Sequence, residues 1–308
     1  MAIFKIHNNN LEQIKEISIK LERDLQTVTE SNLETIFGLD FVSTEFALHQ
    51  FRIDTLAFDK ETNSFVIIEY KRDRSFSVVD QGYAYLALML NNKADFILEY
   101  NESKKENLRR EDVDWSQSRV LFLANSFTAY QQNAINFKDL PIELWEVKKY
   151  NNKTVLYNRL KSEEAKESIK TVSKNKTIQN VSRELKTYSV EDHFKSGWEK
   201  SRELYDELDE RISKLDSRIV KTARQNYIAF KIEGLKWNLC DLHIYKSKVD
   251  IRMIRVDKED LKDPEDKIIR IPWQENRWGK HCSYIVKDVS DIDYGIFLVK
   301  QVYDQFYK

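Results

Sequence analysis

Two carboxylates and one lysine stand near the ends of two predicted strands. The segment FRID ends at Asp54, and the segment FVIIEYK contains Glu69 and Lys71. Because side chains alternate along a strand, Glu69 and Lys71 project from one face, and a hairpin between residues 58 and 65 brings Asp54 beside Glu69. Such an oxygen site suits Mg²⁺, or Mn²⁺, beside a phosphodiester, and Lys71 can hold or deprotonate the attacking water.

The surrounding pattern predicts an α-β-β-β-α-β order. Apolar residues at three- and four-residue steps predict a helix over 11–29, and a short helical turn ends at Gly38. Ser77 is the expected N-cap of a second helix. The predicted strands are 41–46, 51–58, 65–70 and 94–100, and the second helix spans 77–90. Further strands at 119–124, 142–147 and 154–157, with a helix at 127–137, extend the same domain.

The residues Asp54…Glu69-Tyr70-Lys71 resemble the D…(D/E)xK signature of the PD-(D/E)XK nuclease superfamily. The segment QGYAY, from Gln81 to Tyr85, matches the QxxxY element of its RecB-like branch. Glu22 stands where the NucS/EndoMS nuclease module carries a helical glutamate before the aspartate. The resemblance covers roughly residues 11–100, and Tyr70 stands where an aliphatic residue is more usual. It implies a restriction-endonuclease-like core, a mixed sheet flanked by helices.

The resemblance also implies metal-dependent cleavage of a DNA phosphodiester. Asp54, Glu69 and the Tyr70 carbonyl would be metal ligands, and Glu22 would complete the site directly or through water. Lys71 would position the nucleophilic water. Two further residues, Gln81 and Tyr85, would orient Lys71 or contact the DNA backbone, and two neighbours could bind phosphates, namely Arg72 and Arg74.

Each of these residues also has a purely structural interpretation. Glu69 and Lys71 could form an exposed ion pair on an edge strand, although charges at the end of an apolar strand call for a reason. Glu22 could lie on a solvated helix face, and Glu34 and Glu45 are rival third carboxylates. The remaining candidates could be ordinary helix surface, core or solvated side chains: Gln81, Tyr85, Arg72 and Arg74.

Composition limits the class of protein. The chain has 308 residues, a formal net charge of -1, 6 Gly and 3 Pro. It contains no GxGxxG or GxxxxGK[ST] motif, which argues against Rossmann and P-loop enzymes. Two cysteines, Cys240 and Cys282, indicate buried thiols in a reducing cytoplasm. The N-terminus lacks the apolar run of a secretory signal, and no segment approaches the roughly 20 apolar residues of a membrane span.

We expect two domains joined by a linker. Residues 1–158 form the nuclease-like domain with net charge -5, residues 159–195 form a basic linker, irregular or partly helical, with +3, and residues 196–308 form an α+β domain with +1. The last resembles a domain of unknown function found behind such nuclease modules, and its ligand stays open. Its loop 273–281 mixes aromatic and basic groups, for which a structural role is favoured over nucleic-acid stacking. Three histidines lack catalytic or metal-ligand partners: His193, His243 and His281.

The sequence therefore predicts a cytoplasmic, metal-dependent DNA endonuclease acting in repair, restriction or defence. We expect modest, salt-sensitive affinity for DNA, helped by the basic linker or by a homodimer, because the first domain has an acidic excess. The rival interpretation is a catalytically inactive nuclease fold that serves as a nucleic-acid- or protein-binding scaffold. The complete set of Asp54, Glu69 and Lys71 favours the enzyme.

Overall fold

The computed structural model divides the chain into two compact units, Met1–Thr187 and Tyr188–Lys308. It describes residues 2–19, 22–71, 77–137, 139–160, 167–169, 173–186, 188–233, 235, 237–271 and 280–307, and for Glu22 the backbone only. Within these residues, no helix is both long and apolar enough to cross a bilayer.

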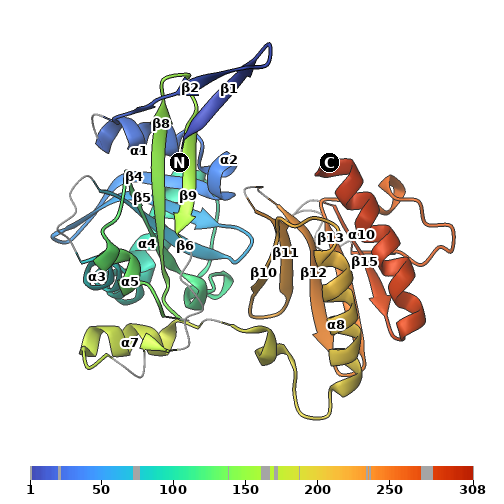
Figure 1. The fold of residues 1–308 in the computed structure, drawn as a ribbon. Coiled ribbons are helices and arrows are strands. Elements are labelled where there is room, and N and C mark those ends of the chain that lie inside the picture. Colours follow the sequence, from blue (N-terminus) through green and yellow to red (C-terminus); the bar gives the residue numbers. More distant parts are fainter. Residues whose placement is uncertain are drawn as a thin grey trace. The chain divides into compact units, whose positions relative to one another are not determined.

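Unit 1 is built on a mixed sheet with strand order β3-β8-β7-β6-β5-β4, and β9 pairs with β8 (Figure 1). The strands β4, β5 and β6 form an antiparallel meander, whereas β7 and β8 run parallel to β6. The bounds are β3 (Glu16–Ile17), β4 (Asp40–Leu48), β5 (Phe51–Asp59), β6 (Ser64–Lys71), β7 (Arg119–Ala124), β8 (Ile142–Tyr150) and β9 (Val155–Leu160).

Helices cover both faces of this sheet, because its central strands are apolar on both sides. On β6, Phe65 and Ile67 join the core cluster of helices α3 and α4, whereas Val66 and Ile68 join that of α1 and α2. Gly38 ends α2 in the left-handed conformation, as predicted. The helices are α1 (Glu22–Glu30), α2 (Leu33–Phe37), α3 (Val78–Asn91), α4 (Lys93–Lys104) and α5 (Ala129–Ala134). The α-β-β-β-α-β order is therefore present, with β7 as its fourth strand.

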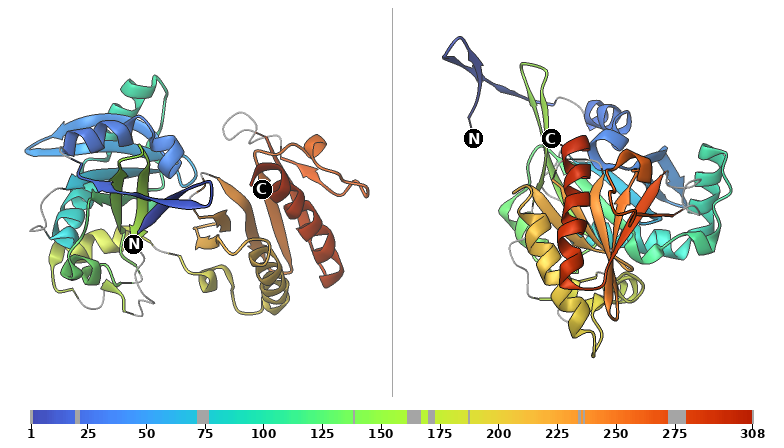
Figure 2. Two further views of the ribbon diagram at one scale, coloured as in Figure 1. Left: turned by 45° about the horizontal axis from the view of Figure 1, so that its top comes forward. Right: turned by 90° about the vertical axis from the view of Figure 1, so that its right-hand side faces the viewer.

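The predicted helix over 11–29 is wrong in its first half. Residues Ile3–His7 (β1) and Asn10–Ile14 (β2) form an antiparallel hairpin, which projects from its unit (Figure 2). Its turn is made by Asn8 and Asn9, which both adopt positive φ. Asparagine tolerates that conformation, so the pair favours a hairpin turn. Only the stretch from Glu22 keeps the helix, with Leu25 buried on the sheet.

The predicted strand over 94–100 is also wrong, because these residues lie in α4. Phe96 and Tyr100, one turn apart, both enter the aromatic core. The Phe96 ring lies 5.2 Å from that of Phe46, and the Tyr100 ring lies 4.8 Å from that of Phe58. A parallel connection from β6 to β7 needs a crossover, and α3 and α4 provide it.

The predicted linker contains an ordered helix, α7 (Lys176–Glu184), that belongs to unit 1. Ile178 and Val181 are buried in the same cluster as α3. The hydroxyls of Tyr83 on α3 and Ser182 on α7 lie 3.2 Å apart. Ile178 and Ser182, four residues apart, therefore lie on one face of α7, and this face packs on α3 although the surrounding sequence is polar.

Unit 2 is an antiparallel sheet in the order β10-β11-β12-β13-β15-β14, packed against helices α8 and α10 (Figure 1). Cys240 and Cys282 are free thiols buried in this core, as expected. The bounds are α8 (Glu199–Ser213), β10 (Ile219–Ala223), β11 (Ile228–Ile232), β12 (Asn238–Tyr245), β13 (Lys248–Ile254), β14 (Ile269–Arg270), β15 (His281–Val286) and α10 (Ile292–Phe306).

Candidate active site

The ends of β5 and β6 bring the two predicted carboxylates together. Thr55 pairs with Ile68, so the next residues outward in this antiparallel register, Asp54 and Glu69, stand opposite each other. The Tyr70 backbone N–H donates a 3.0 Å hydrogen bond to Asp54 Oδ2. The aspartate is therefore fixed against the strand that carries the glutamate.

Lys71 lies on the same side of β6 as Glu69. Its Nζ donates a 2.8 Å hydrogen bond to Glu69 Oε1. The Glu69 side chain is 5% exposed and that of Lys71 is 20% exposed, so the pair is not the exposed surface pair of the structural interpretation. An ammonium group thus stands at the solvent-facing edge of a buried carboxylate.

Helix α3 supplies the other two predicted residues. Ser77 caps this helix by accepting from the Asp80 backbone N–H, as predicted. Gln81 Nε2 lies 3.4 Å from Glu69 Oε1 and 3.4 Å from the Tyr85 hydroxyl. That hydroxyl donates to the Arg52 carbonyl at 3.4 Å. Gln81 and Tyr85 therefore link the helix to both strands of the site.

Gly82 allows α3 to approach the sheet this closely. A Cβ at this position would lie 2.5 Å from Ile142 Cδ1 and 2.9 Å from Ile142 Cγ1 on β8. A larger residue would move the helix or the isoleucine. Gly82 is the neighbour of Gln81, so this packing bears directly on the site.

The surroundings of Glu69 disfavour its negative charge unless a cation lies nearby. Burial, and next the charge of Asp54, raise the pKa of Glu69, while Lys71 partly opposes the shift. Its Oε2 is buried and makes no close hydrogen bond with any described residue, while the Tyr85 hydroxyl interacts with the carboxylate and helps Lys71 to oppose the rise in pKa. A buried carboxylate oxygen without a partner is costly, and a cation would satisfy it. The donor set of Asp54, Glu69 and the Tyr70 carbonyl fits a hard divalent ion.

The other predicted residues cannot be placed at the site from the described part of the chain. Arg72 and Arg74 lie outside the described residues, as does the side chain of Glu22, whose backbone begins α1. Glu45 forms an ion pair with Arg52 and Glu34 is exposed on α2. Within the described residues, no three His, Cys, Asp or Glu side chains form a metal-type cluster.

Sequence reasoning missed a polar group beneath the acidic pair. Gln26 on α1 donates hydrogen bonds to Glu30 and to the Asp54 carbonyl, and Glu30 accepts a hydrogen bond from the Thr55 hydroxyl. The available signals were the four-residue spacing of Gln26 and Glu30 beside buried Leu25, and the unusual Tyr70. The distant pairing of α1 with β5 is not encoded in any local motif.

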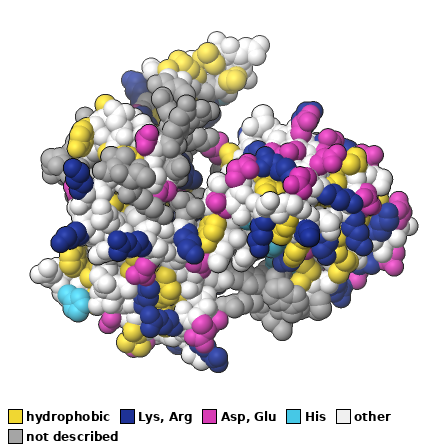
Figure 3. Space-filling view, turned by 90° about the horizontal axis from the view of Figure 1, so that it is seen from below, with side chains coloured by type: hydrophobic (Ala, Val, Ile, Leu, Met, Phe, Trp, Pro, Cys, Tyr) yellow, Lys and Arg dark blue, Asp and Glu magenta, His cyan; other side chains and the backbone are white. Residues whose placement is uncertain are grey.

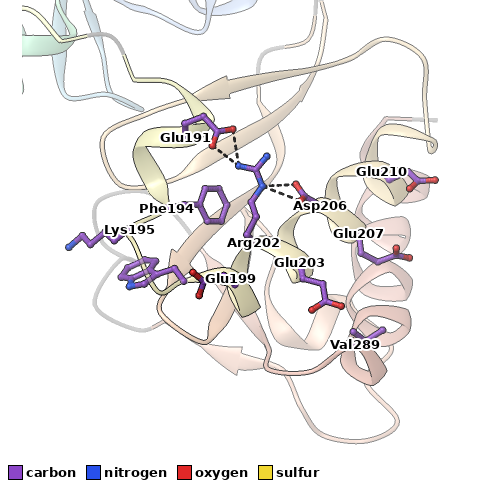
Figure 4. Close-up of a pocket in the computed structure, with 11 residues that line it drawn as sticks. Glu191, Phe194, Lys195, Glu199, Arg202, Glu203, Asp206, Glu207, Glu210 and Val289 are labelled. Atoms are coloured by element: carbon purple, nitrogen blue, oxygen red, sulfur yellow. Dashed lines mark hydrogen bonds and ion pairs between the residues drawn. The ribbon is translucent and has the colours of Figure 1, made fainter.

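Unit 2 carries an open hollow of about 680 Å³ beside α8, whose lining is mainly acidic (Figure 4). Arg202 is held by Glu191 at 2.7 Å and by Asp206 at 2.9 Å, so its charge is already neutralised. Glu199, Glu203 and Glu207 follow one another at successive turns of α8. Such a surface repels phosphates, which argues against DNA binding in this hollow.

Two histidines of unit 2, His243 and His281, lie on strands of its sheet. Burial lowers the pKa of His243 to about 3, so the imidazole is neutral near pH 7, and its ring stacks on Tyr227 at 5.3 Å. His281 is a buried residue of β15. The predicted loop 273–281 lies outside the described residues except for Lys280 and His281, and Lys280 pairs with Asp257 at 3.0 Å.

Two solved structures match part of the chain at low sequence identity. A structure of an EndoMS–dsDNA complex is 18% identical over 43% of this chain and 47% of its own, with a TM-score of 0.29. A repair endonuclease from Pyrococcus abyssi is 17% identical over 43% and 50%, with a TM-score of 0.25. This chain thus spans about half the length of these structures.

Sequence comparisons cover more of the chain. Residues 190–305 match a family described as a domain of unknown function, DUF5655. A Haemophilus influenzae (strain ATCC 51907 / DSM 11121 / KW20 / Rd) protein named "Uncharacterized protein" is 41% identical over 303 residues, which are 98% of this chain and 99% of the relative. The chain therefore belongs to the same family as this Haemophilus influenzae protein.

Proposed function

We propose that the protein is a divalent-metal-dependent DNA endonuclease, with Mg²⁺ or Mn²⁺ as its cofactor. The observation that carries this proposal is the buried Oε2 of Glu69, which makes no close hydrogen bond with a described residue, in a carboxylate that lies beside Asp54 and accepts from the Lys71 ammonium at its other oxygen. An inert scaffold gains nothing from a carboxylate held in this state, because an amide or apolar residue would avoid its desolvation.

Asp54, Glu69 and the Tyr70 carbonyl would hold the ion, and the Glu22 side chain would complete the set directly or through water. When bound, the ion supplies Lewis-acid stabilisation of charge on the phosphoryl oxygens. Lys71 holds the nucleophilic water, and only in its deprotonated form would its amine accept the proton of that water. Gln81 and Tyr85 keep the Glu69 carboxylate oriented through the 3.4 Å contacts from α3.

Arg72 and Arg74 would bind phosphates beside the site. The first 158 residues carry a net charge of -5, and Lys/Arg and Asp/Glu side chains are interspersed on the face drawn in Figure 3. Affinity for DNA is therefore expected to be modest and to fall steeply with salt. A second copy of the chain would add further phosphate contacts.

The competing function is a nucleic-acid- or protein-binding scaffold. It is favoured by the Lys71–Glu69 contact at 2.8 Å, which already supplies one of the two carboxylate oxygens with a cation. The two functions differ in their response to metal, since only the enzyme needs the remaining oxygen as a ligand.

The test combines metal binding with cleavage. Mn²⁺ should raise the Tm of the wild type and not that of Asp54→Asn, because ligand binding stabilises the folded state. Single-stranded, mismatched and duplex DNA should be tested with Mn²⁺, and Asp54→Asn should be inactive on each. Glu111→Gln is the matched control, because it removes an exposed carboxylate away from the site. Its neighbour Asp114 donates a backbone hydrogen bond to Asn63, which lies at the end of β6 opposite to Glu69. An equal Mn²⁺ response in wild type and Asp54→Asn, with no cleavage of any DNA, would establish the scaffold instead.

A further inference from the structure

A partly buried polar network lies beneath the acidic pair, on the α1 side of the sheet. Gln26 Nε2 lies 3.0 Å from Glu30 Oε1, and Thr55 Oγ1 donates to the same Glu30 oxygen at 2.6 Å. The Thr55 and Tyr70 hydroxyls are 3.3 Å apart. The four residues Gln26, Glu30, Thr55 and Tyr70 therefore form a continuous chain from α1 through β5 to β6, here called the underside network.

Apolar residues at these positions would avoid the free-energy cost of removing polar groups from water. Thr55 is fully buried and Tyr70 is 3% exposed, within a cluster that includes Leu25, Ala57 and Ile68. Burial raises the pKa of the Tyr70 phenol, so it stays neutral and can only hydrogen bond. A hydrogen-bonded polar network in such surroundings can fix geometry rather than add net stability.

The network reaches the site through the main chain on both strands. Gln26 Nε2 donates a 2.9 Å hydrogen bond to the Asp54 carbonyl. Tyr70 holds the Asp54 carboxylate through its N–H at 3.0 Å, while its own side chain is anchored beside Thr55. The backbone of Tyr70 also provides the carbonyl of the proposed donor set. The underside network thus fixes Asp54 and the Tyr70 carbonyl, two of the three proposed ligands, from the α1 side of the sheet.

We propose that Gln26, Glu30, Thr55 and the Tyr70 phenol act as positioning residues that set the spacing of the metal ligands on β5 and β6. This inference rests on the proposed metal site. It also assigns a purpose to the tyrosine at the position where the nuclease signature more usually has an aliphatic residue. Outer hydrogen-bond partners of metal ligands commonly change metal affinity by about 10–100-fold.

The test removes the phenol oxygen and measures metal binding by calorimetry. Tyr70→Phe should raise the Kd for Mn²⁺ by about tenfold, because the ring still fills its space while the anchor is lost. Tyr157→Phe is the matched control. Its hydroxyl lies 3.0 Å from Thr29 Oγ1 in the same cluster, and it makes no direct described hydrogen bond with any of the four residues of the underside network. It should lower the Tm to a similar extent and leave the Kd for Mn²⁺ unchanged.

A second variant tests whether the residues act as one unit. Gln26→Met keeps the side-chain length and removes the bond to the Asp54 carbonyl, so it should raise the Kd for Mn²⁺ as Tyr70→Phe does. The double variant should raise it by less than the product of the two single effects. Multiplicative effects, or a Tyr70→Phe variant that behaves like Tyr157→Phe, would overturn the network's role.

Failure of this inference is separable from failure of the proposed function. If Asp54→Asn abolishes Mn²⁺ binding while Tyr70→Phe and Gln26→Met bind like the wild type, the metal site stands and the positioning role is refuted. If Asp54→Asn binds Mn²⁺ as the wild type does, the metal site itself is refuted, and the inference falls with it.

Discussion

The Lys71 ammonium donates a 2.8 Å hydrogen bond to Glu69 Oε1, while the second oxygen of that carboxylate stays buried and makes no close hydrogen bond with a described residue. One side chain is thereby divided into an oxygen that is already neutralised and an oxygen that is available. The division separates the role of the lysine from the role of a metal ion, and the two roles can be tested independently.

Lys71→Met should leave DNA affinity nearly unchanged and lower the cleavage rate by about 10²–10⁴-fold, the usual contribution of a positioned proton-transfer group. Fluorescence anisotropy with labelled DNA would measure binding, and single-turnover cleavage with Mn²⁺ would measure the rate. Loss of binding with undiminished cleavage per bound complex would contradict the role given to Lys71.

Glu69→Gln should make the metal-free protein more stable. Burial and the Asp54 charge raise the pKa of Glu69 despite Lys71, so the fold prefers the neutral side chain, which glutamine imitates. A gain of about 1 kcal/mol would raise the Tm by roughly 2–4 °C for a chain of this size. Thermal unfolding in EDTA gives the measurement, and Glu111→Gln should show no such rise. A lower Tm for Glu69→Gln would mean that the Lys71 ion pair dominates.

Gly82→Ala should destabilise unit 1 and weaken the contacts made by Gln81. The added methyl group meets the Ile142 side chain, and overpacking of this kind costs about 1–3 kcal/mol, which exceeds the roughly 1 kcal/mol that alanine gains over glycine in a helix. Ile142→Val removes Cδ1, the nearest of the opposing atoms. Denaturation of the double variant should therefore recover part of the loss, and strictly additive costs would contradict this packing.

Acid should destabilise unit 2 through His243. Burial lowers its pKa to about 3 from the ordinary 6.5, so the unfolded chain binds a proton below pH 6.5 that the folded chain does not. The stability that the neutral imidazole provides is complete above pH 6.5 and is lost as pH falls toward 3, by at most about 1.4 kcal/mol per pH unit.

Denaturation at pH 7 and pH 5 would measure this effect. His243→Gln should reduce the difference in unfolding free energy between the two pH values. His7→Gln, which changes an exposed histidine of the β1–β2 hairpin, should leave it as in the wild type. Equal pH dependence in all three proteins would refute the assignment to His243.

The parts of unit 1 that were predicted correctly are those with strong local signals. The apolar run from Phe65 to Ile68 marks β6, and Ser77 followed by Asp80 marks the start of α3. The helix predicted for the N-terminal stretch is wrong because Leu11, Ile14 and Ile17 have a spacing that suits a helix, whereas the Asn8-Asn9 turn makes the stretch a hairpin.

The candidate site was predictable to a similar degree. Asp54, Glu69, Lys71, Gln81 and Tyr85 lie together, because strand alternation and one hairpin suffice to place most of them. The underside network was not predictable, because the contact between Glu30 and Thr55 depends on how α1 packs on the sheet. The strand predicted over residues 94–100 is wrong for a related reason: the helix depends on the packing of Phe96 and Tyr100 in the core, which the local sequence does not reveal.

Both sulfhydryl groups of the chain, Cys240 and Cys282, are enclosed in the core of unit 2. Alkylating reagents can reach them only when that core opens, and burial further slows the reaction by raising the pKa of Cys282 to about 12. The kinetics of modification therefore report the opening of one half of the molecule, without a label and with no contribution from the half that holds the carboxylates.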